Sequence, residues 1–146
     1  MSAKLVLNSN EMHESFFRDT VLIGVVCAYP SYRFCALMNS CFDLHLSRDS
    51  DSDVCVKSSQ QVSSYFAFYR YQAPMTSNEF SLYELKREKQ SLLPELKQLD
   101  YLFMMKGPSA EEDAEWYIEA MRTLPDIQLA QMIDMEKLKN VDYLII

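Results

Sequence analysis

The chain has 146 residues, of which 49% are hydrophobic and 12% aromatic, and its 14 Lys and Arg against 21 Asp and Glu give a net charge of −7. This length and apolar content predict one globular domain spanning residues 1–146, because a chain of this size buries enough surface to fold without disulfides or metals. The negative charge disfavours nucleic acid and anionic membranes as partners, since both repel an acidic protein.

The sequence predicts neither an export signal nor a membrane anchor. Its most apolar early run, 21–29, is too short to span a bilayer and follows acidic rather than basic residues. We therefore expect a cytoplasmic protein, in which cysteines stay reduced. We interpret four cysteines as free and mostly buried thiols, namely Cys27, Cys35, Cys41 and Cys55.

The first half of the chain predicts a strand followed by a helix, after a first short strand at 4–7. The run 20–29 is continuous and rich in β-branched residues, which predicts a central strand buried on both faces. Pro30 ends this strand, and Ser31 is expected to cap the helix that follows. The apolar positions of this helix recur at helical spacing and comprise Phe34, Leu37, Met38, Cys41 and Leu44.

An acidic segment and an aromatic run follow the first helix. Residues 48–53 predict a solvated loop, and 54–56 predict a short strand. The run 64–71 alternates as a strand does and is expected to form a hairpin with a strand at 79–86. One face of the run carries Tyr65, Ala67, Tyr69 and Tyr71. Three roles for this face are considered: ordinary sheet packing, a protein interface, and a surface that binds a ligand or nucleic acid.

The second half of the chain repeats the strand and helix pattern. Residues 102–105 predict a strand that ends at Gly107, and Ser109 with Glu112 forms the capping-box pattern S-x-x-E. The apolar stripe of the helix that follows comprises Ala114, Tyr117, Ile118, Met121 and Leu124. The remaining elements are a strand at 127–133, a turn at 135–138 and an apolar end at 143–146.

This order of elements predicts an α+β fold, with a single antiparallel or mixed β-sheet and two main helices packed on one face. The aromatic face of the hairpin would then be either solvated or paired with another surface. Tyrosine is favoured at protein interfaces. Tyr65, Tyr69 and Tyr71 therefore form a possible interaction surface.

A short motif connects the two halves of the chain. Leu93-Pro94-Glu95, three residues, and then Leu99-Asp100-Tyr101 resemble the naming motif of the IPExxxVDY family, with Leu in place of Ile and of Val. Segments 22–24, 32–39 and 138–145 also resemble the family pattern. The resemblance implies a small bacterial cytoplasmic protein without an established biochemical role, so it brings no catalytic residues.

Physical chemistry favours a structural interpretation of the same motif. Pro94 can start a single helical turn, with Glu95 near the positive end of that turn. Asp100 can accept backbone N–H bonds where the turn becomes a strand, or pair with Lys97 or Lys106. The alternative is an acid–base pair of Glu95 and Asp100.

Common cofactor sites are disfavoured by the composition. The chain has two glycines, Gly24 and Gly107, whereas phosphate-binding loops need several close together. His13 and His45 are too far apart in sequence to suggest a zinc site. We therefore expect no cofactor and no metal.

Three weaker patterns also favour ordinary structural roles. Asp49, Asp51 and Asp53 copy the opening of a calcium loop, but Val54 and Gln60 stand where the loop needs Gly and Glu. Cys41 and His45 are the one candidate nucleophile and base, and we interpret Cys41 as core packing. The basic run 86–89 is short and interrupted by Glu88.

These observations favour a non-enzymatic protein-interaction or adaptor module, which binds a protein partner or forms a homo-oligomer. The alternative is a small-ligand-binding protein, or an enzyme with a site of carboxylates and tyrosines that only a three-dimensional structure reveals. A third hypothesis, a role in RNA metabolism, is disfavoured by the negative charge.

Overall fold

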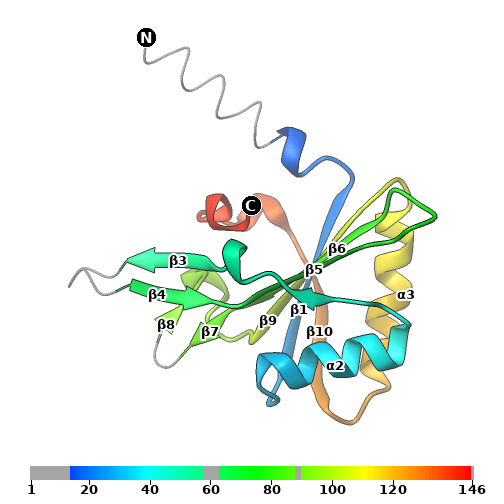
Figure 1. The fold of residues 1–146 in the computed structure, drawn as a ribbon, viewed down its shortest axis with the longest axis horizontal. Coiled ribbons are helices and arrows are strands. Elements are labelled where there is room, and N and C mark those ends of the chain that lie inside the picture. The colour runs from blue at the N-terminus through cyan, green and yellow to red at the C-terminus, as the bar shows by residue number, and fades with distance from the viewer. Residues whose placement is uncertain (1–13, 58–62, 88–89, 146) are drawn as a thin grey trace.

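The computed structural model describes residues 14–57, 63–87 and 90–145 (Figure 1). Its centre is a six-stranded sheet in the order β10-β1-β9-β6-β5-β2, and all neighbouring strands are antiparallel. The strands are β1 (Thr20–Cys27), β2 (Ser47–Arg48), β5 (Phe68–Gln72), β6 (Glu79–Glu84), β9 (Tyr101–Lys106) and β10 (Ile127–Ile133). The predicted α+β class is confirmed. The predicted strand at 4–7, His13, Gln60 and Glu88 lie outside the described residues.

Strand β1 is buried on both faces, as its β-branched sequence predicts. It lies between β9 and β10, and six of its eight residues are buried. Residues on its two faces belong to separate apolar clusters, since Ile23 packs on one side of the sheet and Leu22 on the other. The sheet therefore needs a cover on each face.

Helices α2 (Ser31–Phe42) and α3 (Ala110–Arg122) cover one face of the sheet (Figure 1). Both contribute to the same apolar cluster, in which Phe34 from α2 and Ile118 from α3 pack with Ile23 and Phe103 from the strands. The prediction that two main helices share one face is confirmed.

Both predicted helix caps differ in the structure. Pro30 occupies the N-cap of α2, and its carbonyl accepts the amide of Phe34 at 2.9 Å. The hydroxyl of Ser31 instead lies 3.0 Å from the hydroxyl of Tyr69. At α3 the hydroxyl of Ser109 donates to Asp113, so no capping box forms. Ser31 is already inside the helix because Pro30 occupies the N-cap, and the Ser109 hydroxyl bonds the Asp113 side chain without accepting a backbone amide.

The predicted apolar stripe of α2 is wrong at Cys41, which is exposed. The first turns of the helix face the sheet through Phe34, Cys35 and Met38. The last turn instead contacts α3 through Phe42, whose ring lies 5.0 Å from the ring of Tyr117. This contact turns Cys41 to solvent, and Cys35 takes the buried position.

The aromatic run is two strands rather than one. Strand β4 (Ser63–Phe66) pairs with β3 (Val54–Lys57) in a separate ribbon, and Ala67 separates β4 from β5. A second ribbon joins β7 (Lys86–Arg87) to β8 (Gln90–Ser91). In Figure 1 the β3–β4 ribbon projects away from the two helices.

The acidic segment before β3 is ordered rather than a solvated loop. It contains the 3-10 helix η1 (Ser50–Ser52). Asp53 pairs with Arg48 and accepts the amide of Phe68 at 3.1 Å. Asp49 pairs with Arg70. These partners lie in β2 and β5, so the aspartates join the ribbon to the sheet edge.

The second face of the sheet is covered by short segments of the chain itself. They are η2 (Pro94–Leu96), η3 (Met135–Lys137), η4 (Val141–Leu144) and the residues around Phe16 and Phe17. Leu99 and Leu144 are fully buried there, against Tyr83 and Leu102. The expectation that the aromatic face of the hairpin is solvated or paired with another molecule is wrong for Tyr69 and Tyr71, because both pack in the cluster covered by the helices and not on this second face.

Candidate functional site

The Leu93–Tyr101 motif lies across the second face of the sheet. Pro94 starts the 3-10 turn η2, and Leu93 before it is extended, as a residue before proline should be. Leu99 packs directly on Gly24, because a Cβ atom added to Gly24 would lie 2.4 Å from Leu99 Cδ1. A larger residue at position 24 would therefore force the ends of the Leu99 and Ile133 side chains to move.

Glu95 holds the carboxyl-terminal segment of the chain in place. Its Oε1 accepts the backbone amides of Lys139 and Asn140, each at 3.1 Å, and its Oε2 accepts Asn140 Nδ2 at 2.9 Å. Partial burial raises the pKa of Glu95, but these hydrogen bonds outweigh burial and hold the pKa below its ordinary value. The carboxylate is therefore fully occupied by bonds within the fold.

Asp100 and Tyr101 hold the end of β1. Asp100 Oδ2 accepts the amide of Cys27 at 2.9 Å, and Oδ1 lies 3.3 Å from Lys86 Nζ rather than near Lys97 or Lys106. The Tyr101 hydroxyl donates to the carbonyl of Tyr29. Among the described residues no hydrogen bond joins Asp100 to Glu95. Glu95, Asp100 and Tyr101 thus each make specific contacts within the fold. That the motif is structural remains a prediction, which stability measurements can test.

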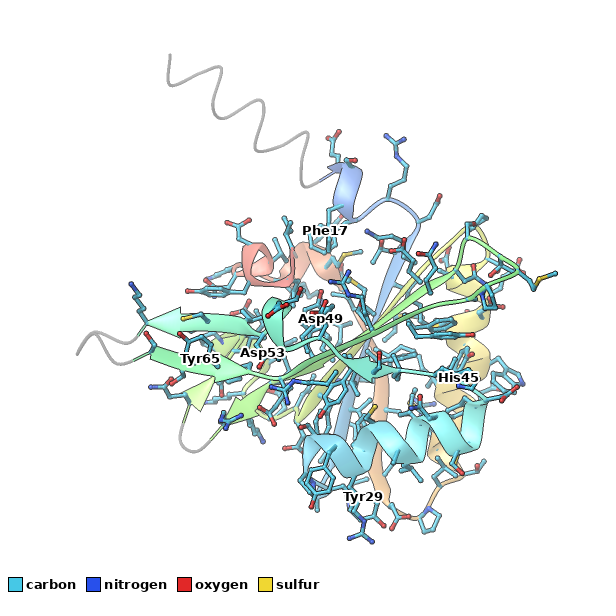
Figure 2. The ribbon with its side chains drawn as sticks, viewed as in Figure 1. Phe17, Tyr29, His45, Asp49, Asp53 and Tyr65 are labelled. Carbon is cyan, nitrogen blue, oxygen red and sulfur yellow. The ribbon has the colours of Figure 1, made fainter. Side chains whose placement is uncertain are left out.

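The three candidate tyrosines do not form one surface. Tyr65 on β4 is 55% exposed, whereas Tyr69 is buried beneath α2. Tyr71 is partly buried, with its ring 5.6 Å from the ring of His45. Figure 2 shows Tyr65 and His45 at opposite ends of the molecule. The break at Ala67 and the cover by α2 explain why alternation alone grouped these residues wrongly.

The four cysteines divide into two buried and two exposed residues. Cys27 and Cys35 are buried, and burial raises the pKa of both thiols. Cys41 and Cys55 are exposed, so the prediction that most are buried is wrong for these two. The ring of His45 packs against Tyr71, and no contact joins His45 to Cys41 within the part of the chain that the structure describes.

This division predicts a simple labelling result. With a thiol reagent whose absorbance changes when it reacts, the folded protein is expected to show two thiols that react rapidly and two that react only after unfolding. A Cys41→Ser/Cys55→Ser variant should lose the fast phase. Rapid modification of Cys27 or Cys35 in the folded protein, located by mass spectrometry, would contradict the structure.

Sequence reasoning missed an exposed surface on α3, which we call the Trp116 surface. It consists of Phe42, Glu112, Glu115, Trp116 and Glu119. The four α3 residues recur at i, i+3, i+4 and i+7, so they share one helix face. Trp116 is 58% exposed, and its ring lies 5.9 Å from that of Phe42 and 5.0 Å from that of Tyr117.

The glutamates of the Trp116 surface are unpaired within the described ranges 14–57, 63–87 and 90–145. None of the ion pairs or hydrogen bonds there involves Glu112, Glu115 or Glu119. The helical spacing of the three glutamates around a tryptophan is visible in the sequence. Trp116 lies outside the buried stripe of the helix, so the apolar periodicity alone does not indicate this surface.

A small polar cavity opens on the opposite face of the sheet, and we call it the Lys106 cavity. It has a volume of about 100 Å³, and its polar lining comes from Arg70, Glu79, Ser81 and Lys106. These residues come from three neighbouring strands, β5, β6 and β9. Only the strand register brings them together, so sequence spacing could not predict this site.

Neither a candidate metal-ligand group nor a membrane-spanning helix is found in the described part of the chain. No group of three or more His, Cys, Asp or Glu residues there could hold a metal ion. No helix there is both long and apolar enough to cross a bilayer. Asp49 and Asp53, which suggested a calcium loop, bind arginines instead (Figure 2).

Comparison with known proteins found no relative. No protein-family model matches the sequence, and neither the curated proteins nor the solved structures include a match. The resemblance to the IPExxxVDY family therefore remains a prediction based on the motif.

Proposed function

We propose that this chain is a non-enzymatic protein-interaction module of the bacterial cytoplasm, and that the Trp116 surface binds a basic segment of a partner protein. The observation that carries the proposal is the exposed Trp116 ring, which lies against Phe42 and Tyr117 among three glutamates that form no ion pair with any residue the structure describes. The bacterial cytoplasm rests on the motif resemblance alone.

Trp116 has the properties of an anchor for a partner. Tryptophan is enriched among the interface residues whose truncation weakens binding most. The neighbouring rings of Phe42 and Tyr117 restrict the indole, so less side-chain entropy is lost when a partner covers it. An exposed aromatic ring that is already held in place favours binding over simple solvation.

The charge of the surface favours a basic partner. Glu112 and Glu115 are three residues apart and Glu115 and Glu119 four apart, and like charges at these spacings destabilise a helix by about 0.2–0.5 kcal/mol per pair. Lysines or arginines of a partner would remove this repulsion. A second copy of the chain is a poor occupant, because two acidic helix faces repel each other.

The chain's single tryptophan makes the proposal directly measurable, because intrinsic fluorescence reports on Trp116 alone. A short helical peptide with lysines on one face and leucines on the other is expected to cause a saturable blue shift that weakens with added salt. The same peptide with glutamates in place of lysines should cause no shift. If both peptides act alike, the proposed charge recognition is wrong.

Charge-reversal variants locate the binding surface. Glu115→Lys/Glu119→Lys is expected to weaken binding of the basic peptide by about tenfold or more, which corresponds to a loss of about 1.4 kcal/mol in binding free energy. Asp51→Lys/Glu136→Lys is the matched control, because it changes the net charge equally at exposed positions away from α3. Trp116→Ala, measured with a fluorescent peptide, should also weaken binding. Equal weakening by both charge variants would show that only net charge matters and would contradict the proposal.

A further inference from the structure

The Lys106 cavity has the composition of a small ligand site. Besides these polar side chains, the cavity is lined by the apolar side chains of Phe16, Phe68 and Met104. We propose that this cavity binds the carboxylate of a small organic acid, with Lys106 as the main cationic partner. The cavity lies on the face of the sheet opposite α3, so this inference stands or falls independently of the Trp116 surface.

The strand register places the polar groups around one space. Ser81 lies beside Arg70 on one side and Met104 on the other, and two residues along the strands Glu79 lies beside Lys106. Alternate residues of a strand point to the same face, so all of these side chains face away from α2 and α3. Further along the strands this face is covered by the carboxyl-terminal segment, and the cavity lies at the other end of these strands, beside Phe16.

Glu79 and Lys106 are the two charged residues of the cavity without an ion pair among the described residues, and Lys106 is the positive one. Its Nζ lies 3.9 Å from the centre of the Phe16 ring, and it has no ion pair within 4.0 Å among the residues that the structure describes. Burial lowers the pKa of Lys106, and Glu79 opposes this shift only in part. An anion placed beside the ammonium group would offset its lost hydration.

Two further hydrogen-bond donors, Ser81 and Arg70, line the cavity. The hydroxyl of Ser81 has no partner among the described residues. Arg70 is held by Asp49, through Nε at 2.7 Å, and by Ser52, so its guanidinium is fixed at the cavity wall. A guanidinium has five N–H donors, so bonds through Nε and Nη2 leave others for a ligand.

The size and charge of the cavity select a short monoanion. Because a water occupies about 30 Å³ of liquid, the cavity has room for about three waters, or for a carboxylate with a short hydrocarbon chain. A peptide segment is too large for this space. Phosphate is disfavoured because its second negative charge would lie near Glu79 and Asp49. The apolar walls suit the hydrocarbon part of a short-chain acid.

Propionate is a suitable probe, and inorganic phosphate is its comparison. In a titration of the full chain followed by NMR, propionate is expected to shift the Lys106 side-chain signals saturably in the millimolar range and to raise the pKa of Lys106. Phosphate should bind at least tenfold more weakly. Absence of a saturable shift with propionate, or tighter binding of phosphate, would overturn the proposal.

Variants test the assignment of residues. Lys106→Met keeps the apolar part of the side chain and is expected to weaken propionate binding at least tenfold. In this variant, binding is followed through the NMR signals of Ser81. Ser81→Ala should weaken it severalfold and is small enough to leave the fold intact. Lys97→Met removes an exposed lysine elsewhere and should change nothing. Equal affinity in Lys106→Met and the parent chain would contradict the proposed role of Lys106.

Discussion

Leu99→Ala is expected to lower the free energy of unfolding by about 3 kcal/mol, the typical loss for a fully buried leucine. Leu99 is fully buried on the second face of the sheet and packs directly on Gly24. Truncation leaves a cavity that the neighbouring strand cannot close. Urea denaturation measures the loss. An unchanged slope of the free energy of unfolding against urea concentration would show that the folded state is otherwise preserved.

A double-mutant cycle tests the contact between Leu99 and Gly24. Gly24→Ala alone is expected to lower the free energy of unfolding by about 1 kcal/mol, because its new Cβ atom would lie 2.4 Å from Leu99 Cδ1 and 2.9 Å from Ile133 Cδ1. In the Leu99→Ala background the closest of these contacts is gone and only Ile133 must move, so the loss should shrink.

Leu96→Ala provides the control for this cycle. Leu96 is a buried leucine of the same motif that is not among the nearest neighbours of a Cβ atom at position 24. Combined with Gly24→Ala, its effect should be additive within about 0.5 kcal/mol. Simple additivity of Gly24→Ala with Leu99→Ala would contradict the packing described for the motif.

Glu95→Ala is expected to lower the free energy of unfolding by about 2 kcal/mol, because it removes the acceptor of three hydrogen bonds to a charged group. The loss is reduced by the exposure of Lys139, whose amide can bind water instead. Chemical denaturation at neutral pH measures this change, and Glu136→Ala at an exposed position is the control.

The contribution of Glu95 should depend on pH. Its pKa is lower in the folded than in the unfolded chain, so its ionised form stabilises the fold above the unfolded pKa of about 4.3. That stability is lost as pH falls through the lower, folded pKa. The difference in stability between the parent chain and Glu95→Gln should therefore be constant near neutral pH and shrink in acid. A difference that stays constant in acid would contradict the hydrogen bonds described here.

Long periodic segments were predictable from sequence. The β-branched run of β1, the predicted strand at 127–133 and the apolar stripe of α3 all occur in the structure. Each of these patterns repeats a local interaction over several residues, so neighbouring sequence determines it. The last turn of α2 departs from its stripe because Phe42 contacts α3, which is distant in sequence.

The cover of the second face was not predictable. Glu95 binds Asn140, 45 residues further along the chain, and the Tyr83 hydroxyl donates to the carbonyl of Leu144. The segments that carry these contacts are single 3-10 turns, too short to show a period. The Lys106 cavity was hidden for a related reason, since its lining depends on the register between three strands.

We propose separate roles for two parts of the chain: the Leu93–Tyr101 motif stabilises the fold, and the Trp116 surface binds the partner. The most direct test measures both properties in one variant, with chemical denaturation and the basic-peptide titration applied to Glu95→Ala under conditions where it stays folded. We predict a loss of about 2 kcal/mol in stability with unchanged peptide affinity. Unchanged stability with lost peptide binding would contradict the account and place the motif at the interaction site.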